Sequence, residues 1–429
     1  MALKLPPALR YPSYRTFWLG SLASVSGFQI LRTAQFWLIF ELTGSPLALG
    51  YVGLANGIPA IILNLVGGLA ADKVDQRRLI VIAQSIAGSL IFLLATLKFL
   101  ESVQVWHILT IAFLTGAVEA FDQPARRSLF PHLIDRRDMM SAVALNSSIW
   151  PGTRIMAPAV AGFIIDWVGT AAAFYVAGLG FFTMALVTFS LRLPRVTRAA
   201  SGGAIHDLLE GLQFIKQTTL FPFLICLTFF SSFFGMAYIP LMPVFAVDIL
   251  QVGAKGQGLL LGVGGIGSLA TSAWLATRSD RGSRGLLIIG GSLMTGLSVA
   301  AFALTSWIVG SFGLALALMF VIGIFTSMSN TSLQSSMQMA VPDRLRGRVM
   351  GFYGMTYNIR PLGGMQAGAL ASLITTPLAV AVGGLALTGF TIAALLSRRV
   401  RKLDGTMREA EAAAQTEQTS YASFPAVNN

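Results

Sequence analysis

The sequence predicts an all-α membrane protein with twelve transmembrane helices arranged in two six-helix bundles. Three observations lead to this prediction. Hydrophobic residues make up 55% of the 429 residues, charged residues make up only 11%, and the apolar residues lie in long runs. Soluble domains carry about 25% charged residues, and disordered chains are less hydrophobic still. Because one spanning helix takes about 20 apolar residues, twelve helices use roughly 240 residues and leave enough chain for short loops.

Twelve apolar runs, separated by short polar segments, define the expected helices. The first six are expected at Phe17–Phe40, Leu47–Ala70, Leu79–Leu100, Trp106–Ala120, Ala142–Ile165 and Ala171–Leu191. The second six are expected at Leu220–Val247, Gly258–Ala276, Leu286–Leu304, Val309–Thr326, Met350–Ile374 and Leu378–Leu396. Polar residues enter the later parts of the fourth and tenth runs, so we expect both helices to continue a turn or more beyond these ends.

Basic residues gather in alternate loops and give the chain a net charge of +12. They lie in the segments 4–15, 73–78, 126–137, 192–216, 278–284, 344–348 and 398–408. The opposite loops hold only Lys98 and Lys255. Since an excess of Lys and Arg marks cytoplasmic loops, we expect a multi-pass protein of the inner (plasma) membrane with both termini in the cytoplasm. A nucleic-acid binder would collect these charges on one polar face, so no nucleic-acid partner is expected.

A polar connection divides the chain into two halves. We expect an N-terminal six-helix bundle at residues 1–193, a central cytoplasmic linker at 194–219, a C-terminal six-helix bundle at 220–397, and a partly disordered cytoplasmic tail at 398–429. Apolar residues recur at helical spacing within the linker, which predicts an amphipathic helix at the membrane surface.

The two halves resemble each other in sequence. A shift of 206 residues places Arg154 on Arg360, and a shift of 208 residues places Asp72 on Asp280. Small residues four apart recur in corresponding helices, at Gly53 and Gly57, Ala157 and Ala161, Gly258 and Gly262, and Gly364 and Gly368. Such pairs let two backbones approach closely in lipid. Parallel repeats with a substrate site between them are typical of secondary transporters.

The segment 68–78, GLAADKVDQRR, resembles the loop signature of the major facilitator superfamily, which has a glycine, an acidic residue four positions on, and then basic residues. Segments 41–50, 120–126, 144–147 and 341–350 resemble one branch, the transmembrane secretion effector type. The resemblance implies the major facilitator fold of twelve helices, alternating access, and efflux driven by an ion gradient. The chain departs from the signature at Asp75 and Gln76, where the family usually has a glycine and a basic residue.

Five charged residues lie within or just beyond the expected helices, where each costs at least about 2.5–3.5 kcal/mol on insertion scales. They are Arg32, Glu119, Asp122, Arg154 and Arg360. From their depth, we expect Glu119 to pair first with Arg154 and next with Arg32. We interpret Glu119, Arg32, Arg154 and Arg360 as a proton-coupling site or the lining of the substrate cavity. Three roles stay open: a structural ion pair, proton uptake and release by Glu119, and recognition of an anionic substrate by the arginines.

A second group near the basic loops is interpreted as a cytoplasmic gate, which is a charge cluster that is stable in one conformation and broken in the other. Its members are Gly68, Asp72, Lys73, Arg77, Asp122, Asp280 and Arg281. We expect Asp122 to hold the loop between the second and third helices through Arg77 or Lys73, with a structural role at the helix end as the alternative. Asp72 is expected to face the start of the eleventh helix, whose unpaired N–H groups favour an anion.

The residue patterns of enzymes and metal proteins are missing from this sequence. The three histidines are widely spaced, and the glycine-rich run 261–267 lies inside an apolar helix without the lysine of a nucleotide-binding loop. We therefore predict no enzyme activity, no metal and no cofactor. The favoured function is a monomeric secondary active antiporter in the lipid bilayer, exporting a small amphipathic organic molecule, drug-like or siderophore-like, against a proton or another coupling ion. The alternatives are an importer or lipid flippase on the same fold, and a membrane scaffold without transport.

Overall fold

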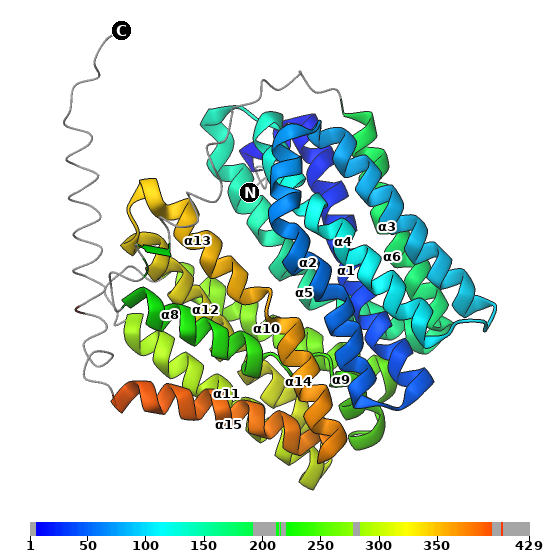
Figure 1. Cartoon of the computed structure of the whole chain (residues 1–429), viewed down its shortest axis with the longest axis vertical. Helices are drawn as coiled ribbons and strands as arrows, with labels where there is room; N and C mark the ends of the chain where they lie inside the picture. The colour runs from blue at the N-terminus through cyan, green and yellow to red at the C-terminus, as the bar shows by residue number, and fades with distance from the viewer. Residues whose placement is uncertain are drawn as a thin grey trace, which may run out of the picture.

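The computed structural model describes residues 6–191, 212–213, 215, 220–277, 284–396 and 405, with side chains for all of these except 64–73 and 343–344. Every regular element in these ranges is helical. The helices form two groups that follow one another along the chain and lie next to each other in space (Figure 1). The predicted linker helix and tail fall almost entirely outside the described residues.

The N-terminal group contains six long helices joined by short connections. They are α1 (Pro12–Thr43), α2 (Pro46–Lys73), α3 (Gln76–Phe99), α4 (Val105–Leu129), α5 (Met139–Val168) and α6 (Thr170–Ser190). Three single-turn helices lie before α1 and between α4 and α5: η1 (Pro7–Arg10), η2 (Phe130–Leu133) and η3 (Arg136–Asp138). The fourth helix continues to Leu129, which confirms that it extends beyond Ala120.

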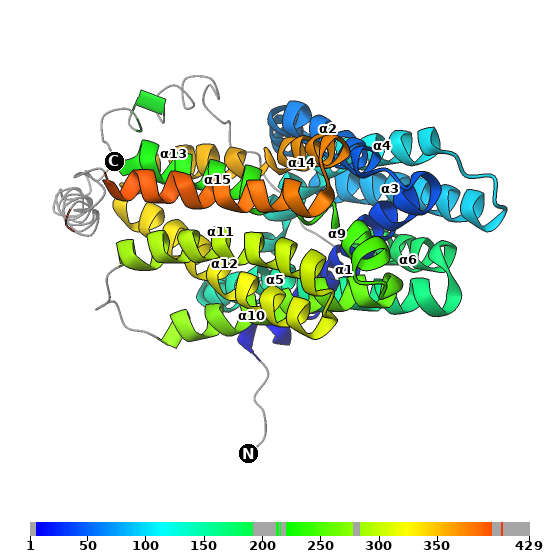
Figure 2. The same ribbon diagram turned by 90° about the horizontal axis from the view of Figure 1, so that it is seen from below.

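The C-terminal group contains four continuous helices and two broken ones. The continuous helices are α10 (Gly253–Thr277), α11 (Arg284–Val309), α12 (Phe312–Ala340) and α15 (Thr376–Leu396). Helix seven consists of α8 (Leu220–Phe230), η4 (Ser231–Gly235), α9 (Met242–Val244) and η5 (Phe245–Ile249). Helix eleven consists of α13 (Asp343–Tyr357) and α14 (Arg360–Leu373). Figure 2 shows α11, α12, α13 and α15 on one side of the molecule and α3, α4 and α6 on the other, with α14 beside α2 and α10 beside α5 between them.

Counting each broken helix once, the described residues form twelve spanning elements, six in each group, so the predicted membrane fold is confirmed. Eight of these elements contain an uninterrupted stretch long and apolar enough to cross a membrane. The other four are the two broken helices together with α1 and α5, which carry Arg32 and Arg154 in their interiors. The charged residues expected within the membrane therefore lie on α1, α5 and helix eleven, and on α4.

Prolines account for where the two helices break. The turn at residues 236–241 in helix seven contains Pro240, and helix eleven is interrupted at residues 358–359, directly before Arg360 and Pro361. A proline removes a backbone donor and disfavours helical backbone at the preceding residue. Hydropathy alone shows one apolar run in each case, so the apolar pattern by itself predicts no break in either helix. By contrast, α5 remains one helix despite Pro151 and Pro158.

The connection between α11 and α12 corrects one predicted boundary. Gly310 has φ +64°, a conformation that favours glycine, and Ser311 accepts a hydrogen bond from the N–H of Leu314 as the N-cap of α12. The tenth helix therefore begins at Phe312 and not at Val309, and it runs to Ala340, well beyond the predicted end.

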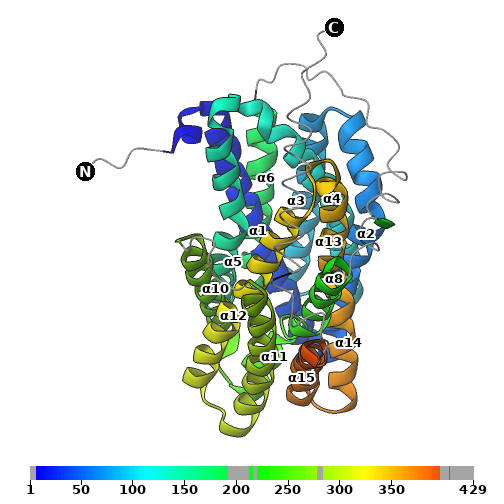
Figure 3. The same ribbon diagram turned by 90° about the vertical axis from the view of Figure 1, so that its left-hand side faces the viewer.

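Two hydrogen bonds join the start of α1 to the start of α5 at one end of the molecule (Figure 3). The Tyr14 hydroxyl donates to the carbonyl of Ala142 at 2.8 Å, and the indole of Trp18 donates to the carbonyl of Leu145 at 3.0 Å. We call this the basic end, because it also carries η3 and the turn between α2 and α3. The turns at Gly44, Glu101, Gly169, Gly253 and Gly310 lie at the opposite end.

The two groups meet along two seams, α2 against α14 and α5 against α10. Of the glycines predicted to allow close approach, Gly57, Gly258, Gly262 and Gly368 line these seams, whereas a Cβ on Gly53 would meet nothing within 4 Å and one on Gly364 would meet Pro240 of its own group. A Cβ on Gly258 would lie 2.5 Å from the carbonyl oxygen of Pro158, and a Cβ on Gly57 would lie 2.1 Å from Cγ of Pro361. Both contacts lie in the parts of the helices away from the basic end. Only glycine allows the backbones to pack this closely.

Toward the basic end the two groups separate. Gly347, Gly351 and Gly354 form a small-residue stripe on α13, and a Cβ at any of them would meet nothing within 4 Å. A Cβ on Gly152, in the basic half of α5, would also meet nothing. Figure 1 shows the ribbons diverging from the α2–α14 contact toward α13. The described conformation is therefore closed at the opposite end and open at the basic end.

Candidate functional site

Three arginines from both groups converge where the closed seams end. Arg32 comes from α1, Arg154 from α5 and Arg360 from the first turn of α14. The charge of Arg154 acts on both other arginines, and the charge of Arg32 also acts on Arg360. The structure thus places side chains that are up to 328 residues apart in sequence within electrostatic reach of one another (360 − 32 = 328).

Each arginine contacts aromatic or sulfur groups, and none has a carboxylate within 4.0 Å among the described residues. The guanidinium of Arg32 lies 5.6 Å from the ring centre of Phe28, and that of Arg360 lies 4.5 Å from the ring centre of Tyr357. Nη2 of Arg154 lies 3.8 Å from the sulfur of Met236 in the turn of helix seven. Nε of Arg360 is buried without a hydrogen-bond partner.

Glu119 lies on α4, and its carboxylate forms neither an ion pair nor a hydrogen bond within the described part of the chain. The charges that act on it are those of Arg32, Asp122 and Arg126. The expected ion pair with Arg154 is therefore wrong. The physical reason is that α5 turns Arg154 toward helix seven of the other group, whereas Glu119 faces the interior of the N-terminal group.

Asp122 belongs to a buried polar chain inside the N-terminal group. Its Oδ2 lies 2.7 Å from Nε of Arg126, one turn later on α4. Nη2 of Arg126 donates to the hydroxyl of Ser24 on α1 at 2.8 Å, and that hydroxyl donates to Oε1 of Gln84 on α3 at 2.9 Å. This buried polar chain links α1, α3 and α4. The sequence reading missed Arg126 as a member, although its i,i+4 spacing from Asp122 was a usable signal.

A small cavity connects this polar chain with Glu119. It has a volume of about 30 Å³, and its polar lining consists of Ser24, Gln84, Thr115, Glu119, Asp122, Gln123 and Arg126, with Trp150 and other apolar side chains around them. That volume is enough for roughly one or two water molecules. Oδ1 of Asp122 is buried and has no hydrogen-bond partner. Water in the cavity can satisfy this oxygen and link it to the Glu119 carboxyl.

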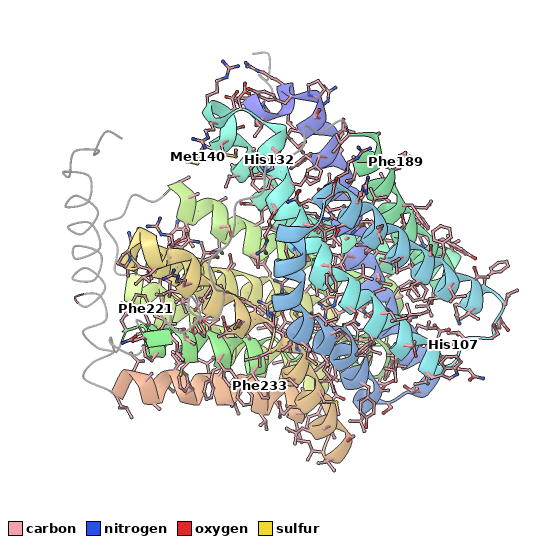
Figure 4. All side chains as sticks on the ribbon, turned by 45° about the horizontal axis from the view of Figure 1, so that its top comes forward. His107, His132, Met140, Phe189, Phe221 and Phe233 are labelled. Atoms are coloured by element: carbon pink, nitrogen blue, oxygen red, sulfur yellow. The ribbon has the colours of Figure 1, made fainter. Side chains whose placement is uncertain are left out.

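Arg77, another expected gate residue, lies at the basic end and binds within its own group. Its guanidinium donates to the carbonyl oxygens of Thr188 and Phe189 at the end of α6, and it lies 5.7 Å from the ring centre of Phe189. Figure 4 shows Phe189 at the same end as His132 and Met140. A cation suits these carbonyls, which carry the negative end of the α6 dipole. Arg77 is thus separate from Asp122, which pairs with Arg126 instead.

The remaining expected gate residues fall where side chains are not among those described. Gly68, Asp72 and Lys73 lie in the last turns of α2, where only the backbone is described. Asp280 and Arg281 lie outside the described residues. Within those residues, no group of three His, Cys, Asp or Glu side chains is arranged to hold a metal ion. Figure 4 shows His107, in the first turn of α4, far from His132, which lies in η2 beyond the other end of α4.

Two parallel six-helix groups, with charged side chains between them and one end open, define a multi-pass membrane transporter. The chain belongs to the transmembrane secretion effector family of the major facilitator superfamily, whose profile matches residues 5–423. This membership confirms the resemblance seen in the sequence and excludes an enzyme as the class of protein.

Relatives and solved structures agree with this membership. The chain is 26% identical to the multidrug efflux pump Tap of Mycolicibacterium fortuitum over 90% of this chain and 95% of that protein. It is 23% identical to the enterobactin exporter EntS of Escherichia coli over 88% of this chain and 89% of that protein. The crystal structure of a D-xylose–proton symporter superposes with a TM-score of 0.70 at 13% identity, covering 89% of this chain and 97% of that chain.

Proposed function

We propose that this transporter exports a small amphipathic organic molecule by alternating access, driven by an ion gradient. The observation that carries the proposal is the convergence of Arg32, Glu119, Arg154 and Arg360 at the point where the closed seams end. Charged groups at membrane depth are expensive and mark substrate or ion pathways. A scaffold protein needs none of them.

The two halves, residues 1–193 and 220–397, act in this proposal as two units that rock about the site. Because the basic loops are proposed to be cytoplasmic, the conformation that is open at the basic end receives substrate from the cytoplasm. Export then requires the seams at the opposite end to separate while the basic end closes. The unfilled stripe of Gly347, Gly351 and Gly354 on α13 provides a surface for that second closure.

Glu119 is the proposed coupling residue. It is the one acid in the charged centre that lacks an ion-pair partner among the described residues, so its charge is free to change during the cycle. The cavity beside it has room for water, which can carry a proton between the carboxyl and the polar chain of Asp122. Asp122 and Arg77 are proposed to brace the gate from within the N-terminal half, since both bind inside it in this conformation.

The direction of transport is supported by the relatives that are named as efflux pump and exporter, and it is tested with oriented vesicles. Everted membrane vesicles containing the protein should accumulate an amphipathic fluorescent dye when a gradient is applied, and right-side-out vesicles should not. Accumulation only in right-side-out vesicles would establish an importer on the same fold. Absence of gradient-dependent movement in both, for a protein that binds dye in detergent, would contradict the transport proposal.

A further inference from the structure

The charged centre of the molecule carries an excess of positive charge. Three guanidinium groups, those of Arg32, Arg154 and Arg360, act on one another, and Glu119 is the acid that acts on Arg32. Asp122 does not offset this excess, because it is already paired with Arg126 at 2.7 Å. Counting these side chains leaves two positive charges without a counter-charge among the described residues (3 − 1 = 2).

Such an arrangement is unfavourable in the empty protein. Arg32 and Arg360 are partly buried, where like charges repel more strongly than in water, whereas Arg154 is exposed. An arginine cannot lose its proton to relieve the repulsion. A sequence that needed only a packed interior would place apolar residues here, or a carboxylate beside each arginine. The buried Nε of Arg360 also lacks an acceptor, which is an uncommon situation for a buried donor.

The geometry of the arginines is suited to an anion. Guanidinium groups bind carboxylates, phosphates and similar oxyanions through two parallel hydrogen bonds. Arg360 begins α14, so the positive end of that helix's dipole adds positive potential at the same place. The three side chains come from both halves, so that one ligand can bridge α1 and α5 to α14.

The surroundings of the arginines are aromatic. Phe28 and Trp150 pack edge to face with 5.6 Å between ring centres, and Arg32 lies over Phe28. Tyr357 lies beneath Arg360, and the Tyr353 and Tyr357 hydroxyls are 2.5 Å apart. An inorganic anion would leave these surfaces unused, whereas an aromatic or aliphatic body attached to the anionic groups would cover them.

We propose that the substrate is an organic anion with at least two negative charges on an apolar or aromatic body, held by Arg32, Arg154 and Arg360 together. Polycarboxylates are of this chemical class. The inference rests on the proposed transport function. It restricts the proposed substrates from amphipathic molecules in general to anionic ones. Cationic drugs are excluded from this site because three arginines repel them.

The test compares two dyes that share a xanthene core. Carboxyfluorescein is polyanionic, and a rhodamine ester is cationic. Binding to the purified full-length protein in detergent is measured by fluorescence anisotropy, without any gradient. We expect saturable binding of carboxyfluorescein and none of the rhodamine ester. Arg154→Gln and Arg360→Gln should each weaken carboxyfluorescein binding by roughly tenfold or more, because a charge-assisted hydrogen bond contributes about 1.5–3 kcal/mol.

Two controls keep binding separate from folding. Arg136→Gln removes an exposed arginine of η3 at the basic end and should leave dye binding unchanged. Arg154→Gln should melt at the same temperature as the parent protein or higher, since it removes repulsion between like charges. A lowered melting temperature would show that Arg154 has a structural partner and would count against the inference.

The outcomes also separate this inference from the transport proposal. Preferential binding of the rhodamine ester, unaffected by the two arginine substitutions, would overturn the anion assignment, and its gradient-driven uptake into everted vesicles would leave export standing. Arginine-dependent binding of carboxyfluorescein without uptake in vesicles of either orientation would support the anion site and contradict export. Lack of saturable binding of carboxyfluorescein would overturn the inference.

Discussion

Asp122 and Arg126 form a buried ion pair one turn apart on α4, with 2.7 Å between Oδ2 and Nε. Arg126 also donates a hydrogen bond to Ser24 on α1, and Ser24 donates one to Gln84 on α3. The pair therefore holds the N-terminal half together, and in this conformation it makes no contact with Arg77. Because these interactions link α1, α3 and α4, they allow the N-terminal half to move as a rigid unit against the C-terminal half.

Removing one member of this pair should destabilise the protein. Arg126→Gln leaves Asp122 buried without its counter-charge, and breaking a buried pair in this way costs about 3–5 kcal/mol. We expect a clearly lower melting temperature in detergent, with partial recovery in the double variant Asp122→Asn with Arg126→Gln. Glu101→Gln, which changes an exposed acid in the turn between α3 and α4, is the matched control and should melt normally. An unchanged melting temperature for Arg126→Gln would show that the pair has no structural role.

Closure at the opposite end should depend on Gly258. A Cβ at this position would lie 2.5 Å from the Pro158 carbonyl, so Gly258→Ala should force α10 away from α5. Spin labels at Ser102 and Thr375, one in each half at the opposite end, should then report a longer distance than in the parent protein, in a Cys226→Ser background. Gly290→Ala is the control, because a Cβ there meets nothing within 4 Å. Equal distances in both glycine variants would contradict the seam described here.

Much of the fold could be predicted from the sequence because it depends on one-dimensional patterns. Apolar runs gave twelve helices, and small residues four apart gave the helices that meet at the seams. The predictions failed where local backbone chemistry overrides hydropathy. Hydropathy does not register the break before Arg360 and Pro361, nor the turn at residues 236–241, although the prolines were visible. The late start of α12 likewise depends on Gly310, whose positive φ no hydropathy average detects.

The depth of each charged residue in the membrane could be predicted from the sequence, but the direction in which its side chain points could not. A residue count places Glu119 and Arg154 at similar heights, since each residue adds 1.5 Å along a helix. It does not tell which way each helix is rotated, and that rotation is set by packing against neighbouring helices. As a result, the sequence paired Glu119 with Arg154, whereas the structure turns Arg154 toward Met236 in the other half. The sequence also placed Arg126 in the basic segment after the fourth helix, whereas α4 continues to Leu129 and includes it.

The proposed orientation can be tested with single cysteines in a Cys226→Ser background, since Cys226 is exposed. Ser102→Cys and Thr375→Cys lie in exposed turns at the opposite end and should react in intact cells with a membrane-impermeant maleimide. Met140→Cys, at a side chain 81% exposed at the basic end, should react only after the membrane is permeabilised. Labelling of Met140→Cys in intact cells would reverse the orientation argued from the basic loops.

Glu119→Gln should leave the stability of the protein nearly unchanged. Its carboxylate has no ion-pair partner among the described residues, so the amide leaves no buried charge unpaired. A melting temperature close to that of the parent protein is therefore expected in detergent. A large loss of stability, rescued by a second substitution at Arg32, would show instead that Glu119 serves as the structural counter-charge of Arg32.

The central claim is that an ion gradient acts on the transport cycle through Glu119. The most direct measurement compares two transport modes of Glu119→Gln in everted vesicles, using the dye that vesicles with the parent protein accumulate. Exchange of labelled for unlabelled dye without a gradient needs binding and alternating access only, whereas uphill accumulation also needs the titrating carboxyl. The account predicts that exchange persists and that accumulation is lost. Uphill accumulation at the parent rate in Glu119→Gln would contradict it.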